Sequence, residues 1–559
     1  MSLQRIPRWG VARVTVALLG LALIAFGVFG AAGALPAYAV GTVHSPIVGS
    51  GSTWSANALQ AWIRNVWANY QWKITYSESG STQGRNDFAN GTSDFGVSEI
   101  PYAIANSNEA DIRPSREFAY MPIVAGGTAF MYNLEIGGKR VTNLRLSGDT
   151  IAKIFTGVIT RWDDPQVKVD NPALVLPSIP IVPVVRSDGS GATAQVSIWL
   201  RQEHAGLWDA YCPKVGRPLV NDHCGVTSNY PVIPGSGFVA RSGSNGVAGY
   251  VALPHAVGAI TFVEYSYALN SGYPVAKVLN GAGYYTEPTA QNVAVGLLSA
   301  QINEDTASPE YLTQDLTNVY TSADPRTYSL SSYSYSILPT ALGGSFTENK
   351  GLTLADFGAY FLCEGQQSAE VLGYSPLPIN LVQAGQKQLQ KVPGGNPVIK
   401  GITDCNNPTF SPDGSNKLAN EAPYPADCDK QGPTQCTTGT GGAKDTPTGA
   451  GAATGPGAAT AAGDETGAGG GPAAGDGQQA AGSEGVLDAE TAPVIVAASP
   501  QSIPVAAVSL LPSLAMAGFG GGLFAFSAIP PILGKRGRTS LLPDPTDGIT
   551  DTSRGLTRS

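Results

Sequence analysis

The spacing of apolar and polar positions alternates between strand-like and helix-like patterns along the first part of the chain. The run 179–185 is apolar and rich in β-branched residues, which predicts a buried strand, and 194–203 has helical composition. Apolar residues recur at helical spacing from Leu59 to Tyr70 and predict an amphipathic helix. Residues 72–76 alternate as a half-buried strand does. We expect the tryptophans of this region to lie in a core: Trp62, Trp67 and Trp72.

Three turns rich in Gly, Ser and Thr each stand between a predicted strand and a predicted helix, at residues 49–54, 79–84 and 186–191. Such a turn leaves backbone N–H groups unpaired at the positive end of a helix dipole, where an anion is favoured. One such turn is weak evidence, because Ser and Thr are ordinary helix caps. Three of them together predict that hydroxyl and backbone donors surround a small tetrahedral anion.

The third turn also carries charge. Arg186 offers a planar fork of donors that suits an oxyanion, and Asp188 can hold that fork in place. Taken alone, residues 186–193 fit a solvated loop with a surface ion pair as well as an anion site. The other two turns favour the anion site.

These turns belong to a longer resemblance. The chain from about residue 44 to about residue 400 resembles the phosphate-binding proteins of high-affinity phosphate ABC importers, which are two-lobed substrate-binding proteins. The blocks that carry the resemblance occur in order at 49–54, 79–84, 94–99, 186–191, 243–248, 259–267 and 314–318. Residues 120–128 and 335–339 resemble the two segments by which the family's chain crosses between lobes.

The resemblance implies an α/β fold of two lobes, of the type II periplasmic-binding-protein class. It implies mixed sheets with flanking helices and two crossing segments. Lobe I is expected to contain residues 40–125 and 335–405, and lobe II residues 126–334.

The resemblance also implies a set of phosphate contacts. The expected contacts are Thr53, Trp54, Ser81, Glu99, Arg186, Ser190 and Gly191, supported by Asp188, Ala192 and Thr193. Two positions depart from the family pattern: Glu99 replaces an aspartate, and Ala192 replaces a threonine.

Both departures have chemical consequences. A carboxylate repels a fully ionised anion but accepts a hydrogen bond from P–OH, so Glu99 is expected to select protonated phosphate over sulfate. Ala192 keeps its backbone N–H but lacks a hydroxyl donor. Losing a hydrogen bond to a charged partner costs about 1.5–3 kcal/mol.

We therefore expect capture of inorganic phosphate outside the cell and its delivery to an ABC-type permease. An alternative is a surface sensor of phosphate or another oxyanion, or an adhesin-like receptor, that uses the fold without transport. No enzyme, cofactor or metal site is expected, because the four histidines are scattered and no nucleophile set is present. The net charge of −9 provides no basic footprint for nucleic acid.

Six cysteines in an exported chain suggest disulfides. Fifteen pairings are formally possible. Proximity in the sequence is the only argument for Cys212 with Cys224 and Cys428 with Cys436, which leaves Cys363 with Cys405.

The two ends of the chain carry targeting signals. Residues 1–39 combine arginines, an apolar stretch and an Ala-Tyr-Ala site, as a signal peptide does, although an uncleaved anchor is an alternative. Residues 406–490 are expected to hold a cysteine-containing segment and then a disordered Gly/Ala/Pro stalk, flexible from Thr437 onward. The uncharged run 513–533 predicts a transmembrane helix, and 534–559 a cytoplasmic tail. The protein is expected at the cell surface, tethered to the plasma membrane.

Overall fold

The computed structural model describes residues 43–109, 113–397, 401–448 and 458–459. The expected signal peptide, most of the expected stalk, the apolar run 513–533 and the tail 534–559 lie outside these ranges. Within the described ranges, no helix is long and apolar enough to span a bilayer.

A single mixed sheet of eleven strands runs through both lobes. Its main path follows the order β11-β8-β12-β4-β17-β3-β1-β2. The two-lobed α/β fold that the sequence predicted is therefore present, and the sheets of the two lobes are continuous with each other.

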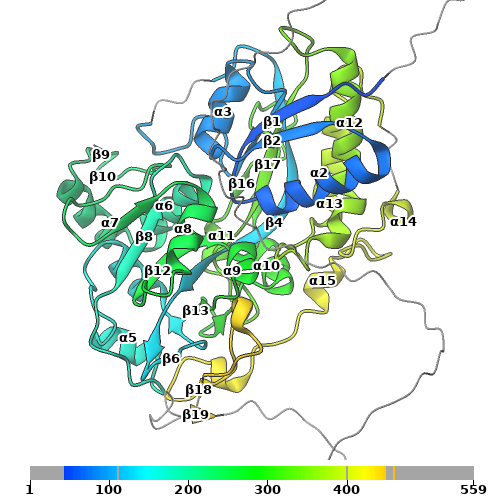
Figure 1. Cartoon of the computed structure of the whole chain (residues 1–559). Coiled ribbons are helices and arrows are strands. Elements are labelled where there is room, and N and C mark those ends of the chain that lie inside the picture. The colour runs from blue at the N-terminus through cyan, green and yellow to red at the C-terminus, as the bar shows by residue number, and fades with distance from the viewer. Residues whose placement is uncertain (1–42, 110–112, 398–400, 449–457, 460–559) are drawn as a thin grey trace, which may run out of the picture. The chain divides into compact units, whose positions relative to one another are not determined.

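Two long strands, β4 (Phe118–Tyr132) and β17 (Ser331–Pro339), join the lobes (Figure 1). They pair antiparallel with each other, and the last residues of β4 pair with β12 in lobe II. Apart from Phe118 at the start of β4, every residue in both strands is buried. The crossings predicted at 120–128 and 335–339 lie in these strands.

Lobe I is built on three parallel strands with helices packed against them. Trp62 and Val66 of helix α2 are buried in its core, but Trp67 is 45% exposed, so the prediction that it lies in the core was wrong. Five residues of helix turn a side chain about 140° away, which places Trp67 on the opposite face from Trp62. The elements of lobe I are β1 (Ile47–Gly51), α2 (Ala56–Tyr70), β2 (Ile74–Ser77), α3 (Ser81–Ala89), β3 (Phe95–Ser98), α12 (Glu348–Leu362), η2 (Glu364–Ser368) and α13 (Ile379–Leu389).

Lobe II is built on β8, with β11 and β12 parallel on either side of it. Apolar residues form two core clusters in this lobe. Its elements are β5 (Glu135–Ile136), β6 (Lys139–Arg140), β7 (Arg145–Leu146), α4 (Gly148–Phe155), α5 (Pro165–Asp170), β8 (Val182–Arg186), α6 (Gly191–Glu203), α7 (Ala205–Tyr211), η1 (Cys212–Val215), β9 (Leu219–Val220), β10 (His223–Cys224), β11 (Val239–Arg241), α8 (Gly243–Val251), β12 (Ala259–Glu264), α9 (Tyr265–Ser271), β13 (Val275–Leu279) and β14 (Tyr285–Thr286).

Short elements lie between β14 and β17 and after α13. Helix α10 contacts both crossing strands, so it lies where the lobes meet. These elements are α10 (Ala290–Leu297), β15 (Gln301–Ile302), β16 (Gln314–Asp315), α11 (Thr317–Tyr320), α14 (Ile402–Cys405), α15 (Lys417–Asn420), η3 (Asp427–Asp429), β18 (Gln435–Cys436), η4 (Gly441–Ala443) and β19 (Ala458–Ala459).

The chain after residue 400 is packed further than the sequence indicated. Thr440 is buried and donates its hydroxyl to the carbonyls of Thr142 (3.0 Å) and Val275 (2.5 Å). The Thr142 N–H donates to Thr448 Oγ1, with an N···O distance of 3.0 Å. The expectation of a flexible chain from Thr437 is therefore corrected: residues 437–448 pack against lobe II, because their hydroxyl and backbone groups find partners there.

Candidate functional site

The three Gly/Ser/Thr turns meet where lobe I faces lobe II. The first connects β1 to α2, the second leads into α3, and the third connects β8 to α6. Across the lobe interface, the Gly191 N–H donates to Ser81 Oγ (3.1 Å) and the Thr82 N–H donates to the Gly189 carbonyl (3.2 Å). Turns far apart in the sequence thus come together at one place.

Two glycines permit this close approach. A Cβ on Gly191 would lie 2.1 Å from Glu99 Oε2 and 2.7 Å from Ser81 Oγ. Gly80 has a φ of +90°, and a Cβ there would lie 2.7 Å from Asp188 Oδ2. Any side chain at either position would push the lobes apart.

Arg186 is the central cation of the site and is only 3% exposed. Its Nε donates to Asp188 Oδ1 (2.8 Å) and its Nη2 to Asp188 Oδ2, as the sequence predicted. Burial by itself would raise the pKa of Asp188, but hydrogen bonds and charge from Arg186, with the Gly243 N–H, outweigh it and lower that pKa. The carboxylate therefore stays ionised and holds the guanidinium in place. Arg186 Nη1 remains directed at Ser244 Oγ (3.4 Å).

Glu99 is buried at the end of β3 and accepts three hydroxyl hydrogen bonds. Its Oε2 accepts from Ser81 (2.7 Å), and its Oε1 accepts from Ser334 (2.7 Å) and from Ser52. Ser52 and Ser334 were not among the site residues predicted from the sequence. Ser52 lies inside the first turn and could have been named, whereas Ser334 lies in a Tyr/Ser-rich strand that carries no local signal.

Thr53 makes contact across the interface through its side chain. Its Oγ1 lies 2.8 Å from Ser244 Oγ and accepts the Ser244 N–H at 3.2 Å. Ser244 was not among the predicted residues, although it stands in the block 243–248. The Trp54 indole packs in the core and donates to Thr128 Oγ1 (3.3 Å), so only its backbone can serve the site.

Backbone donors at the site are buried and unpaired. Thr53 and Trp54 are 4% and 1% exposed, yet among the described residues neither N–H has a hydrogen-bond acceptor. Ala192 N–H, in the first turn of α6, likewise has none within those ranges. Since buried N–H groups are almost always paired, such a cluster indicates a place for an acceptor.

The start of α6 has the form of a capped helix. Ser190 is the N-cap, and its Oγ accepts the Thr193 N–H at 3.2 Å. Ala192 is buried and provides no hydroxyl. The Thr193 hydroxyl is also buried and has no hydrogen-bond partner in the described part of the chain.

The rim of the interface has its own contact set, which the sequence did not indicate. Glu109 of lobe I accepts both the N–H of Ser228 (2.9 Å) and its hydroxyl (2.6 Å), and it also accepts from Thr227. Burial by itself would raise the pKa of Glu109, but hydrogen bonds from Ser228, Thr227 and Asn229 lower it overall. The Ser228 carbonyl in turn accepts the Ser190 N–H at 2.9 Å.

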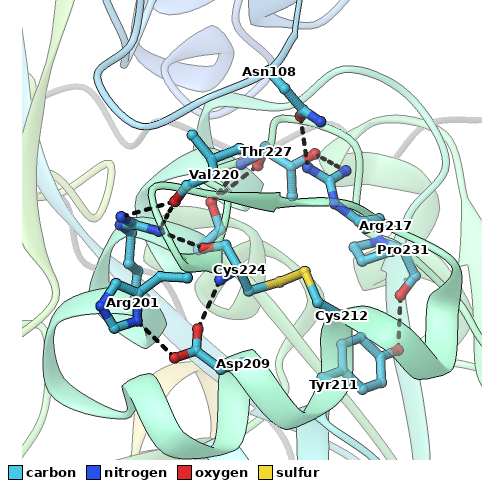
Figure 2. The surroundings of a disulfide bond; sticks show 12 residues. Asn108, Arg201, Asp209, Tyr211, Cys212, Arg217, Val220, Cys224, Thr227 and Pro231 are labelled. Carbon is cyan, nitrogen blue, oxygen red and sulfur yellow. Dashed lines mark hydrogen bonds and ion pairs between the residues drawn. A yellow bond between two sulfur atoms is a disulfide. The ribbon is translucent and has the colours of Figure 1, made fainter.

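The disulfide loop, residues 212–224 of lobe II, lies beside this rim. Figure 2 shows Asn108 of lobe I next to Arg217 of the loop, with Nη2 3.4 Å from Asn108 Oδ1. The Cys212–Cys224 bond closes the loop against α7. The two pairings suggested by proximity, Cys212–Cys224 and Cys428–Cys436, are present, and so is the remaining pair, Cys363–Cys405.

The chemistry of the site is that of binding. Around the three turns it gathers hydroxyl and N–H donors, the guanidinium of Arg186 and the carboxylates of Asp188 and Glu99. In the described ranges, no three His, Cys, Asp or Glu side chains group closely enough to hold a metal ion.

Two lobes on a continuous mixed sheet, with convergent donors at their interface, define a two-lobed α/β binding protein. The family model described as a PBP superfamily domain matches residues 36–364. The chain belongs to that superfamily.

Curated relatives match over most of their own length. The phosphate-binding protein PstS of Methanocaldococcus jannaschii is 29% identical over 345 residues, covering 60% of this chain and 83% of the relative. PstS of Xylella fastidiosa strain Temecula1 is 29% identical over 348 residues, covering 62% and 86%. PstS 2 of Mycobacterium tuberculosis is 28% identical over 355 residues, covering 60% and 86%.

Two solved structures match at lower identity. A phosphate-binding protein from Stenotrophomonas maltophilia is 17% identical, with a TM-score of 0.44, and covers 61% of this chain and 93% of its own. An ABC-type phosphate transport receptor from Vibrio cholerae is 15% identical, with a TM-score of 0.35, and covers 59% and 100%.

Proposed function

We propose that this protein captures inorganic phosphate and passes it to an ABC-type permease. The observation that carries the proposal is the pair of buried N–H groups at Thr53 and Trp54, beside Arg186 and the α6 N-terminus, which have no acceptor among the described residues. These donors suit a small tetrahedral oxyanion. The curated relatives named as phosphate-binding proteins support this ligand.

Charge balance favours a protonated ligand. Asp188 already neutralises Arg186, and Glu99 adds a second carboxylate. Binding must therefore depend on dipolar donors more than on net charge. A ligand P–OH can donate to Glu99, whereas sulfate carries no proton near neutral pH and would meet only repulsion.

Lobe closure is the mechanism that we propose. Thr53, Trp54 and Ser81 belong to lobe I, and Arg186, Ser190 and Gly191 to lobe II. These groups come together only where the lobes touch, so we expect phosphate to select that arrangement and to replace the contact in which the Gly191 N–H donates to Ser81 Oγ. The permease would then recognise the closed protein, and no bond is made or broken.

Calorimetry of the full-length chain with phosphate, arsenate and sulfate tests this function. We expect phosphate and arsenate to bind and sulfate to bind at least a hundredfold more weakly. Equal binding of sulfate would refute the role of Glu99, and no binding of phosphate or arsenate would refute the site.

Localisation is part of the same proposal. Residues 1–39 would direct export, and 513–533 would anchor the chain to the plasma membrane, with 449–490 as spacer. Fractionation of cells that express the full chain, or the chain ending before residue 490, tests the anchor. A shortened chain that stays entirely on the cell surface would contradict it.

A further inference from the structure

Three buried tyrosines from three different elements converge on one turn. Tyr76 of β2 donates its hydroxyl to the Ser52 carbonyl at 2.8 Å. Tyr267 of α9 donates to the Thr53 carbonyl, and Tyr374, which follows η2, donates to the Trp54 carbonyl at 2.7 Å. Three successive carbonyls are thereby fixed.

Fixing a carbonyl also fixes the N–H that shares its peptide plane. In a trans peptide the C=O and the following N–H point in opposite directions. Tying the carbonyls of Ser52 and Thr53 therefore directs the N–H groups of Thr53 and Trp54 away from the tyrosines. Those two N–H groups are the buried donors that find no acceptor in the described part of the chain.

Two further facts suit the tyrosines to this task. Burial raises the pKa of Tyr76, Tyr267 and Tyr374, so each phenol remains an O–H donor throughout the physiological range. Tyr76 and Tyr374 belong to the lobe I core, whereas Tyr267 belongs to a lobe II core cluster. The contact from Tyr267 thus forms only when the lobes meet.

We propose that Tyr76 and Tyr267 are positioning residues that aim the Thr53 and Trp54 N–H groups at the bound anion, with Tyr267 completing the arrangement on closure. Tyr374 fixes the next peptide, whose N–H belongs to Ser55 and donates to Ser52 Oγ (3.2 Å). This inference rests on the proposed phosphate function. Tyr267 would link the ligand turn of lobe I to lobe II without touching the ligand.

Single Tyr→Phe variants at Tyr76 and Tyr267 test this role in the full-length chain. The matched control is Tyr333→Phe, because Tyr333 is also buried and also donates to a backbone carbonyl, that of Leu312 (2.9 Å). We expect phosphate affinity to fall about tenfold in Y76F and in Y267F and to be unchanged in Y333F, at a temperature where circular dichroism shows all of them folded.

The outcomes separate the two levels of the proposal. If the wild type binds and Y76F and Y267F bind equally well, the positioning role is refuted even if their melting temperatures fall. If the wild type itself does not bind phosphate, the proposed function is refuted instead. A greater rise in koff for Y267F than for Y76F would support its role in closure.

A separate observation concerns residues 401–448, which follow helix α13 of lobe I and which we call the strap. Its beginning is fixed to lobe I. The Cys363–Cys405 disulfide attaches it to the end of α12. Asn407 Nδ2 and Thr409 Oγ1 both donate to the Leu377 carbonyl, at 3.1 and 2.8 Å.

The middle of the strap lies against the hinge. Leu418, Ala419 and Ala422, in and just after α15, pack on α10. Arg326 Nη1 donates to the Ala419 carbonyl at 3.1 Å. Figure 1 shows α15 next to α10, between α14 and β18.

The end of the strap is fixed to lobe II. Arg145, which is 1% exposed, donates through Nη1 to the carbonyls of Cys428 (3.1 Å) and Thr434 (2.8 Å). Lys277 pairs with Asp429 at 2.7 Å, and both side chains are largely buried. The disulfide Cys428–Cys436 closes the loop that Arg145 grips.

We infer that the strap is a third connection between the lobes and limits how far the cleft opens. The two crossing strands alone would allow a wider hinge motion. The strap lies outside the matched family model, which ends at residue 364.

A specific protease site inserted between Asp413 and Gly414 tests this, because it disturbs only local contacts among residues 411–415 and leaves the strap's contacts with both lobes in place. Pro412, Asp413 and Gly414 are exposed, and space around Gly414 is open. Spin labels at N69C and K139C, which are exposed positions on the two lobes, report the interlobe distance before and after cleavage. The control carries the same site between Gly235 and Ser236, an exposed loop of lobe II.

After cleavage in the strap we expect a longer and broader interlobe distance without phosphate, an unchanged distance with saturating phosphate, and several-fold weaker phosphate binding. Cleavage in the control loop should change none of these. An unchanged interlobe distance in the phosphate-free cleaved protein would refute the proposal that the strap limits opening. That measurement needs no phosphate, so it stands even if the proposed function fails.

Discussion

The hydroxyl of Ser81 donates to Glu99 Oε2 at 2.7 Å, so a predicted anion donor and a carboxylate are directly joined. The same Ser81 oxygen accepts the Gly191 N–H from the other lobe. Glu99 therefore lies within the donor set, and any ligand there must be compatible with a negative charge.

Glu99→Gln should weaken discrimination between phosphate and sulfate. The amide keeps the size of the side chain but removes the negative charge. It also adds N–H groups that can donate hydrogen bonds to sulfate. We expect sulfate affinity to rise at least tenfold by calorimetry, with a smaller change for phosphate. Glu304→Gln, an exposed site away from the interface, is the control. Unaltered rejection of sulfate in E99Q would contradict this role.

Arg186→Lys should weaken phosphate binding by about a hundredfold or more. Lysine keeps the charge but loses the planar fork that pairs with Asp188 through two nitrogens. Charge-assisted hydrogen bonds of this kind contribute about 1.5–3 kcal/mol each. Calorimetry gives the affinity, and thermal unfolding shows whether the variant is folded. A folded R186K that binds like the wild type would exclude Arg186 from the site.

Glu109→Gln should raise the dissociation rate of phosphate by about tenfold, because a hydrogen bond to a charged group contributes about 1.5–3 kcal/mol. The contacts of the Glu109 carboxylate with Ser228 of lobe II form only when the two lobes meet. Stopped-flow release of phosphate measures this rate. An unchanged dissociation rate would show that the rim contact does not control opening.

The same rim contact predicts a pH dependence. Because the pKa of Glu109 is lowered in the folded protein, its contribution is fully present above the ordinary pKa of a glutamate, about 4.3. It is lost as pH falls through the lowered value. We therefore expect phosphate release to accelerate only below about pH 4, and E109Q to lack that part of the acceleration. The comparison of wild type with E109Q across pH decides this.

Replacing Cys212 and Cys224 together by serine should destabilise lobe II by about 3 kcal/mol, the scale for closing a loop of this length. The pair closes a loop of sequence separation 12 against α7. Denaturant unfolding measures the loss. Since neither cysteine contacts the three Gly/Ser/Thr turns, the phosphate affinity of the folded variant should stay within a factor of a few. A large loss of affinity in a folded variant would show that the loop acts on the site.

Local sequence features predicted much of the fold and several residues of the candidate site. The Gly/Ser/Thr turns, the strand before Arg186 and the pairing of Arg186 with Asp188 are all set by neighbouring residues. Two disulfide pairs followed from proximity in the sequence, and the third was the pair that remained. Trp67 was misplaced because a broad apolar stripe on α2 does not say which part of it faces the core.

Other parts depended on contacts between distant residues. Ser334 reaches Glu99 from 235 positions away, and Thr53 reaches Ser244 from 191 positions away. The contact of Glu109 with Ser228 and the packing of residues 437–448 also join segments with no shared pattern. A single sequence carries no signal for such pairs.

The sequence by itself determined which turns would offer donors, because strand, turn and helix signals act over a few residues. The tertiary structure alone decided how those donors are aimed and enclosed. Three tyrosines fix the first turn, Glu99 is held by serines from three segments, and the strap joins both lobes. The physical reason is that hydrogen-bond direction and burial are properties of groups brought together in space, and crossing strands bring these groups together.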